Sequence, residues 1–404
     1  EGLSRQAEEQ QAALVPSAAI RVLHLINGQH YAGAERVQDL LALRLPEFGF
    51  EPAFAAVKPG LFGIRRLSQK TPLFQTPMRS RLDLRPARRL ARIVRQEGYR
   101  LIHAHTPRTL LVGVLAAWWA RVPLLYHVHS PAWADSTRWF FNWTNAAVER
   151  LAIRRASAVI CVSRTLADQM RRRIGEAANM VVVPNGVPSA QSRWTPRSLC
   201  LTPGSAMHRA TPGPAPFTPT VGVVALFRPR KGIEVLLEAA ALLDRQGLPV
   251  RVRAVGPFES PMYEAAVRQK AIQLGLAGHV EWTGPVEQVE AQLAQMDLFV
   301  LPSLFGEGLP MVLLEAMAVG TPIIASQIDG MEEVVEDGQQ GLLVPPGNPQ
   351  TLAQAIAHLL THPDQAVRLS ENARQRHLER YSDRAMAAGV AKVYRQVLAQ
   401  SLDR

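Results

Sequence analysis

The sequence contains few of the features that define several common classes of protein. Its 404 residues include only two cysteines, Cys161 and Cys200, with no CxxC pair and no adjacent histidine. This excludes a disulfide-based scaffold and gives no sign of a cysteine-ligated metal, so we expect a reducing compartment. The longest apolar run, Thr109 to Ala120, has about twelve residues, whereas a membrane-spanning helix needs ~20. We therefore expect no membrane-spanning segment.

Familiar cofactor and metal patterns are also missing. The glycine loop Gly28 to Gly33 is not followed by Gly-Lys-Ser/Thr, so it is not a Walker A loop. The sequence contains no GxGxxG, which argues against a dinucleotide oxidoreductase, and no Asp-x-Asp metal motif. His103 and His105 form a His-x-His pair, but no third ligand has a recognisable spacing. We expect these two histidines to lie at the end of a strand, near a bound acceptor substrate at most.

Positive charge is concentrated in the first half of the chain. The net charge is +11; residues up to Val187 carry +13 and the remainder −2. Five arginines share one predicted helix, namely Arg85, Arg88, Arg89, Arg92 and Arg95. A solvated surface and a face that meets anionic lipid or an anionic acceptor both remain open. Nucleic-acid binding is not expected, because no aromatic residues interleave the arginines and no reader motif is present.

The chain contains two blocks in which strand and helix patterns alternate. Residues 20–27 (IRVLHLIN) are a continuous apolar run, typical of a strand buried on both faces. A glycine loop and a helical pattern from Ala34 to Leu45 follow, as at the start of a doubly wound domain. The alternation restarts beyond residues 188–219, which are rich in Pro, Ser, Thr and Gly. We predict two doubly wound α/β domains whose strand ends face a central cleft.

The predicted domain boundaries follow these changes in composition. The polar start of the chain lacks the order of a signal peptide, so we expect a flexible extension there. The last residues form a long amphipathic pattern, which we expect to pack back on the first domain as a helix. The segments are a 1–19 extension, a 20–187 acceptor domain, a 188–219 linker, a 220–381 donor domain and a 382–404 helix.

The most specific segment is Ser303 to Ile324 (SLFGEGLPMVLLEAMAVGTPII). Its two glutamates, Glu307 and Glu315, are eight residues apart, and in a continuous helix they would lie about 80° apart on one face. Glu315 sits in the apolar run MVLLEAMA, where a carboxylate without a donor costs several kcal/mol. The pattern favours a site in which one glutamate faces a sugar and the other accepts hydrogen bonds from ribose hydroxyls.

A helix is predicted to begin inside this segment, directly after a strand. Pro310 suits the first helical turn, and Gly308 lets backbone amides approach a ligand closely. Exposed N–H groups at a helix N-terminus bind anions. We therefore expect a diphosphate to bind at Gly308, Leu309 and Met311, with Ser303 at the start of the same loop.

These segments resemble the retaining glycosyltransferases of family 4, which have the two-Rossmann GT-B fold. The family's Glu-x7-Glu hallmark is matched by Glu307 and Glu315 in EGLPMVLLE. The resemblance covers nearly the whole chain beyond the first nineteen residues. Weaker segments occur in the family's order, namely NGQHYAGAER, HAHTPRTL, YHVHSP, ICVSR, VVVPNGV, FRPRKGIEVLLEA and VEDGQQGLLVPPGNP.

The resemblance implies roles for several other residues. Lys231 and a nearby arginine, in VALFRPRKG, would bind the donor diphosphate and stabilise the leaving nucleotide. The family commonly has arginine where this chain has Leu226, so Arg228 or Arg230 is expected to replace it. His129 matches the histidine that lines the sugar site, where it would hydrogen-bond a sugar hydroxyl or steady the leaving sugar's charge.

The glycine loop also matches the family, with Ala32-Gly33 in place of an adjacent glycine pair, so Gly33 is expected near the donor phosphates. The predicted reaction is sugar transfer from a UDP- or GDP-linked donor to a glycan or lipid-linked acceptor. The anomeric configuration is retained, and no metal or other cofactor is required. No carboxylate nucleophile stands out, which is consistent with front-face departure and attack through an ion-pair-like state.

Two alternatives remain open. One is a nucleotide-sugar epimerase on the same scaffold, and the other is a non-catalytic glycan- or lipid-binding relative, for which Leu226 provides a reason. We expect a cytoplasmic protein that binds no nucleic acid. Its basic first half would suit peripheral contact with the anionic inner face of the cell membrane.

Overall fold

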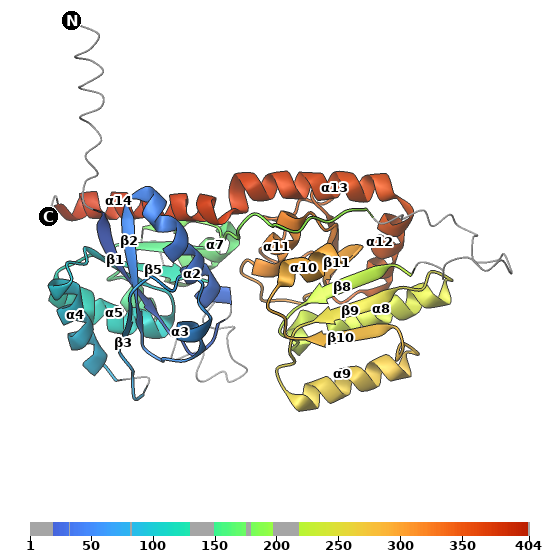
Figure 1. The fold of residues 1–404 in the computed structure, drawn as a ribbon, viewed down its shortest axis with the longest axis horizontal. Coiled ribbons are helices and arrows are strands. Elements are labelled where there is room, and N and C mark those ends of the chain that lie inside the picture. The colour runs from blue at the N-terminus through green and yellow to red at the C-terminus, as the bar shows by residue number, and fades with distance from the viewer. Residues whose placement is uncertain are drawn as a thin grey trace, which may run out of the picture. The chain divides into compact units, whose positions relative to one another are not determined.

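The computed structural model describes residues 19–31, 33–80, 83–129, 149–174, 179–196 and 218–402. Within these ranges the chain forms two sheets of parallel strands, with helices between most successive strands (Figure 1). The predicted architecture of two Rossmann-like α/β domains is confirmed. Among the described residues, no helix is both long and apolar enough to cross a membrane.

The chain packs into two compact units. The first comprises Glu1–His127, Val148–Val159 and Ala387–Arg404, and the second comprises Val128–Ala147 and Ile160–Met386. These divisions concern only the residues that the structure describes within each range. The domain boundaries expected from composition stay predictions, and most of the expected linker, 197–217, lies outside the described residues.

The first sheet has seven strands in the order β3-β2-β1-β4-β5-β6-β7. The central strand β1 (Ile20–Ile26) pairs in parallel with β2 (Phe50–Ala56) on one side and with β4 (Leu101–Ala104) on the other. The order of strands reverses between β1 and β4, so a crevice is expected beyond their carboxyl ends. The remaining strands are β3 (Leu73–Gln75), β5 (Leu124–Val128), β6 (Ala158–Cys161) and β7 (Met180–Val182).

Helices connect these strands, and local sequence explains where one of them begins. Thr106 caps α5 (Pro107–Ala120) by accepting from the backbone N–H of Thr109, and Pro107 occupies the first turn. The other helices are α2 (Gly33–Arg44), η1 (Leu45–Phe48), α3 (Leu61–Arg65), α4 (Arg85–Gln96) and α7 (Arg164–Ile174). The sequence also predicts a helix over 142–156, of which residues 142–148 lie outside the described residues.

The second sheet has six strands in the order β10-β9-β8-β11-β12-β13. Its reversal point lies between β8 (Thr220–Val224) and β11 (Leu298–Leu301), which pair in parallel. The loops that follow these two strands therefore lie next to each other at one edge of the sheet. The other strands are β9 (Arg251–Val255), β10 (Val280–Gly284), β12 (Ile323–Ser326) and β13 (Leu342–Val344).

Helices and short helical turns complete the second part of the chain. They are η3 (Pro229–Lys231), α8 (Ile233–Arg245), α9 (Pro261–Gln273), α10 (Val289–Ala294), α11 (Met311–Val319), α12 (Pro349–Thr361), α13 (Pro363–Arg376) and η4 (His377–Tyr381). The last helix, α14 (Asp383–Leu402), contributes its residues from Ala387 onward to the first unit. There the ring of Tyr394 packs edge-on against Phe50, with 5.1 Å between centroids.

Candidate active site

Two loops meet at the reversal point of the second sheet. The loop after β8 contains η3, which ends at Lys231, and the loop after β11 contains Glu307. Gly232 has a left-handed φ of 65°, and a Cβ there would lie 2.0 Å from the carbonyl oxygen of Pro302. Only glycine permits this approach. The contact is secured by Leu304, whose backbone N–H donates to the carbonyl oxygen of Arg230 at 2.8 Å.

The carboxylate of Glu307 is the centre of a charged cluster. It accepts hydrogen bonds from Lys231 Nζ and, at 2.8 Å, from Ser303 Oγ. Arg230 Nη1 lies 3.5 Å from the same oxygen and donates to the carbonyl oxygen of Gly306 at 2.8 Å. The Glu307 side chain is only 6% exposed, so these interactions are poorly screened by water. Two cations share one carboxylate, which leaves the cluster with an excess of positive charge.

Burial and charge act in opposite directions on Lys231. Loss of solvent lowers the pKa of Lys231, while the charge of Glu307 and its hydrogen bond partly offset this effect. Neighbouring Arg230 and Arg228 also disfavour a charged Lys231, to a smaller extent. An incoming anion would relieve that repulsion, so the site is arranged to receive negative charge.

The two arginines that the sequence left as alternatives lie in different surroundings. Arg230 joins the Glu307 cluster, whereas Arg228 Nη1 lies 3.8 Å from a carboxylate oxygen of Glu259. Leu226, which stands where the family commonly has arginine, is 41% exposed. Arg230 is therefore the arginine that accompanies Lys231 at Glu307.

Glu307 and Glu315 do not share a helix. The chain turns at Gly306 with φ 75°, and α11 begins at Met311 after its N-cap, Pro310. As the sequence predicted, the helix opens only after Glu307, so the separation of about 80° for a continuous helix does not apply. Glu315 lies within α11 and is 4% exposed. The same start places the N–H groups of the first turn beside the Glu307 loop.

His129 lies against the backbone of this loop, within the second unit. A Cβ on Gly308 would lie 2.5 Å from the His129 carbonyl oxygen, so only glycine fits. Burial lowers the pKa of His129 to about 4, which leaves its ring neutral at pH 7. Glu307 and Gly308 open onto a small hollow that is also lined by Ser163, Thr165, Leu166, Gln169 and Asp329.

The residues from α7 and from the loop at 329–333 were not identified from the sequence. Glu333 accepts from the backbone N–H groups of Arg164 at 2.7 Å and Thr165 at 2.6 Å, and so caps α7. Gln169 Nε2 donates to Asp329 at 3.1 Å. Their only sequence signal is an ordinary helix start and an acidic loop, more than 150 residues apart along the chain.

Two other predicted positions lie in the first unit. Gly33 is the first residue of α2, and a Cβ there would meet none of the described atoms within 4 Å. His103 and His105 lie beside His24 from β1, a third histidine that the spacing of the pair did not reveal.

Taken together, two cations, the amides at the start of α11 and a carboxylate suit a ligand with a diphosphate and hydroxyl groups. Models of two families match the chain: Glycosyltransferase Family 4 over residues 31–191 and Glycosyl transferases group 1 over residues 209–376. The architecture is that of a GT-B glycosyltransferase. A structure of HepE from Anabaena with UDP superposes with a TM-score of 0.79 at 24% identity, covering 93% of this chain and all of that one.

Curated relatives give the same assignment. Alpha-maltose-1-phosphate synthase of Mycolicibacterium smegmatis is 30% identical over 326 residues, covering 75% of this chain and 80% of that protein. Alpha-D-kanosaminyltransferase of Streptomyces kanamyceticus is 29% identical over 318 residues, covering 76% and 79%. The chain belongs to the family 4 glycosyltransferases.

Proposed function

We propose that this protein transfers a sugar from a UDP- or GDP-linked donor to a glycan or lipid-linked acceptor, with retention of anomeric configuration. The observation that carries the proposal is the contact of Lys231 and Arg230 with Glu307 at the reversal point of the second sheet. A solved relative of the same fold, HepE from Anabaena, was crystallised with UDP-glucose (TM-score 0.77).

In the proposed complex the diphosphate replaces Glu307 as the partner of Lys231 and Arg230. Lys231 and Arg230 then stabilise the negative charge that develops on the departing nucleotide, without a metal ion. The amides of Gly308, Leu309 and Met311 bind the same diphosphate. Glu307, released from its ion pairs, accepts hydrogen bonds from sugar hydroxyls, with Ser303 Oγ limiting its movement.

Glu315 and His129 complete the proposed donor site. The buried carboxylate of Glu315 accepts hydrogen bonds from the ribose hydroxyls, since a carboxylate in an apolar helix needs hydrogen-bond donors. Because His129 is neutral at pH 7, it binds the sugar through hydrogen bonds rather than as a cation. With no carboxylate assigned as nucleophile, departure and attack occur on the same face of the sugar, which retains the configuration.

A thermal-shift screen of UDP-, GDP- and ADP-sugars tests the donor assignment. We expect one nucleotide class to raise the melting temperature of the wild type and of Glu371→Ala, an exposed position on α13. Glu315→Ala should abolish the shift, and Glu315→Gln should reduce it. If none of the nucleotide sugars shifts the wild type, the donor assignment is wrong.

Turnover of the identified donor separates the alternative functions. A glycosyltransferase consumes donor only when acceptor is present, apart from slow hydrolysis. An epimerase would convert the donor without any acceptor, and a non-catalytic relative would leave it unchanged in the presence of broad acceptor pools. Anomer analysis of the product by NMR then tests retention.

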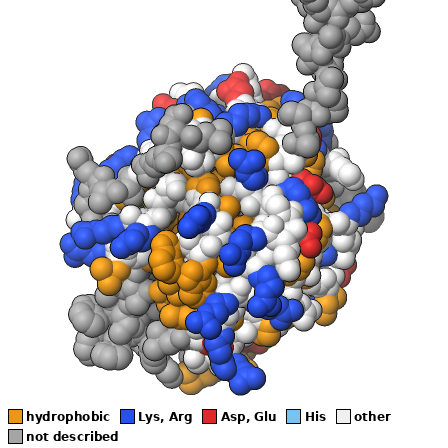
Figure 2. Space-filling view, turned by 90° about the vertical axis from the view of Figure 1, so that its left-hand side faces the viewer, with side chains coloured by type: hydrophobic (Ala, Val, Ile, Leu, Met, Phe, Trp, Pro, Cys, Tyr) orange, Lys and Arg blue, Asp and Glu red, His pale blue; other side chains and the backbone are white. Residues whose placement is uncertain are grey.

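We also propose that the first unit contacts an anionic membrane through α4 and α5. The two helices pack together, and Arg88 lies over the ring of Trp119 at 5.7 Å. All five arginines of α4 are exposed, and Trp118 on α5 is 70% exposed. Figure 2 shows basic side chains around a group of apolar side chains on this face. Arginine with tryptophan suits the headgroup region of an anionic bilayer.

Sedimentation with vesicles tests this surface. Vesicles that contain phosphatidylglycerol should bind the protein, whereas pure phosphatidylcholine vesicles should not. Arg88→Glu/Arg92→Glu should weaken binding at least about tenfold, since each basic residue contributes ~1 kcal/mol near such a surface. Arg245→Glu/Arg251→Glu, two exposed arginines of the second unit, makes the same change in charge and should have little effect. Equal losses for the two double variants would contradict a specific face.

A further inference from the structure

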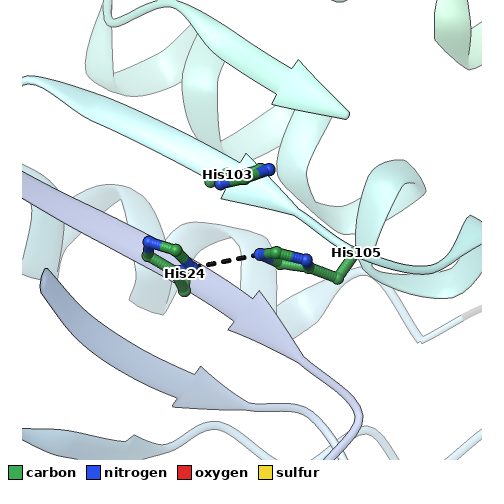
Figure 3. Close-up of side chains that lie close together, drawn as sticks. All are labelled: His24, His103 and His105. Atoms are coloured by element: carbon green, nitrogen blue, oxygen red, sulfur yellow. Dashed lines mark hydrogen bonds between the residues drawn. The ribbon is translucent and has the colours of Figure 1, made fainter. Parts of the chain in front are cut away.

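A cluster of buried histidines lies at the reversal point of the first sheet. His24 on β1 and His103 on β4 are register partners on adjacent strands, and His105 follows β4 directly (Figure 3). The side chains of all three are at most 2% exposed. His24 Nδ1 lies 3.0 Å from His105 Nε2, and the rings of His103 and His105 have centroids 4.1 Å apart.

The hydroxyl of Tyr394, on α14, orients two of these rings. It lies 2.7 Å from His103 Nδ1 and 3.1 Å from His24 Nε2. Each of the two rings therefore uses one nitrogen for Tyr394 and directs the other elsewhere. In His24 that other nitrogen is Nδ1, which faces His105.

We propose that His24, His103 and His105 form a binding site for one divalent transition-metal ion of the zinc class. Each residue offers a nitrogen, and the three atoms all lie within 4.8 Å of one another. Tetrahedral zinc, with Zn–N of about 2.0–2.1 Å, holds its nitrogens ~3.3 Å apart, so small ring movements suffice. Three histidines leave a fourth position for solvent, and Tyr394 supplies the outer hydrogen bonds that metal-bound histidines require.

The protonation state of His24 is compatible with an ion. Desolvation lowers the pKa of His24 to about 3, so its ring is neutral at pH 7 and has a lone pair to donate. To bind the ion through Nδ1, His24 carries its proton on Nε2, directed at the Tyr394 oxygen. The neutral His24 ring thus coordinates the ion without losing a proton.

A hydrogen-bonded network without an ion is the competing explanation. Tyr394 O–H can donate to His24 Nε2 while His24 Nδ1–H donates to His105 Nε2, which satisfies these atoms internally. In that case the cluster would bind no metal with stoichiometry or affinity above that of ordinary surface histidines. The chain offers a suitable comparison in His358 and His362, one turn apart and exposed, with ring centroids 4.3 Å apart.

Metal titration of the full chain distinguishes these explanations. The purified protein is treated with a chelator, dialysed and titrated with Co²⁺, followed by competition between Zn²⁺ and a chromophoric chelator. We expect one equivalent of tightly bound Co²⁺ with the intense visible absorption of tetrahedral coordination. Tyr394→Phe should keep the stoichiometry and weaken affinity about 10–100-fold, because it removes only the outer hydrogen bonds.

Ligand and control variants locate the site. His105→Gln should lose the tight equivalent and its absorption band, while His358→Gln/His362→Gln should keep both. Circular dichroism confirms that each variant is folded; if His105→Gln is not, the wild-type stoichiometry and the Tyr394→Phe affinity decide. Absence of a tight equivalent in the wild type would overturn the proposal, as would its loss in the His358→Gln/His362→Gln variant alone.

Discussion

The reversal points of the two sheets have the same topology and opposite chemistry. Between β1 and β4 lie imidazole rings, with His24 and His103 fully buried. Between β8 and β11, it holds charged groups, with Lys231 and Glu307 in contact and 14% and 6% exposed. The fold thus fixes where a ligand can bind, whereas the side chains on two loops decide what that ligand is.

The largest effect is expected from a substitution in the charged site. Lys231→Ala should lower kcat for sugar transfer by about 10²–10³-fold, because it removes a cation that acts on charge developing in the transition state. Initial rates at saturating donor measure the effect. Lys270→Ala is the control, since Lys270 contacts Glu238 on a more exposed helix pair, at 33% and 38%. If the two variants lose activity equally, Lys231 has no special role.

Glu307→Gln tests the same site by distinguishing the contact of Glu307 with Lys231 from its contact with Ser303. The neutral amide should still meet Ser303, but it no longer competes with a diphosphate for Lys231. We expect transfer to fall at least about tenfold while free UDP or GDP binds as tightly as to the wild type, or more tightly. Kinetics combined with calorimetry checks both effects. Parallel losses in rate and nucleotide affinity would contradict the exchange of partners at Lys231.

Arg230 should contribute more than Arg228 to the affinity for the nucleoside diphosphate. Arg230→Ala should raise the Kd of the nucleoside diphosphate about tenfold, because its guanidinium lies in the Glu307 cluster. Arg228→Ala, which removes a side chain beside Glu259, should have a smaller effect. Calorimetric titration of both variants measures the difference. The reverse order would assign the family's second cation to Arg228.

Acid should destabilise the protein through its buried histidines. The pKa of His129 is lowered from 6.5 to about 4 on folding, so the unfolded chain binds this proton more strongly. Its contribution to stability is therefore present above pH 6.5 and is lost as the pH falls towards 4, by at most about 1.4 kcal/mol per pH unit. Urea unfolding of wild type and His129→Asn between pH 4 and 7.5 checks this, and identical pH profiles would contradict it.

The smallest effect on donor binding is expected at the histidine cluster of the first sheet. Tyr394→Phe should lower the free energy of unfolding by roughly 1–3 kcal/mol, since it leaves buried ring nitrogens without their partner. Donor binding should not change, because the substitution touches only the first unit. Denaturant unfolding and nucleotide titration on one preparation provide the two readouts. Loss of nucleotide binding without loss of stability would contradict the view that the two regions have separate roles.

The sequence predicted the features that depend on local patterns. A continuous apolar run identified β1, and the loop with Glu307 was placed correctly after β11. By contrast, β2 was not predicted, because Glu51 and Pro52 interrupt its apolar run, and β3 has only three residues. Strands that form mainly by pairing with a neighbouring strand have little periodic pattern in their own sequence.

The charged site was less predictable than the fold. Spacing identified Glu307, but helical geometry could not give its orientation relative to Glu315, because Glu307 precedes α11, which begins at Met311. The distinction between Arg228 and Arg230 depends on Glu259, which is distant in sequence. His24 joins His103 only through strand register, which no short motif records.

The most direct test of the central claim is to measure what the diphosphate contributes to binding. Calorimetry compares UDP with uridine, or GDP with guanosine, on the wild type, Lys231→Ala and Lys270→Ala. The charged reversal point predicts that the affinity ratio of nucleotide to nucleoside falls at least about tenfold in Lys231→Ala and is unchanged in Lys270→Ala. An unchanged ratio in Lys231→Ala would show that the diphosphate binds elsewhere.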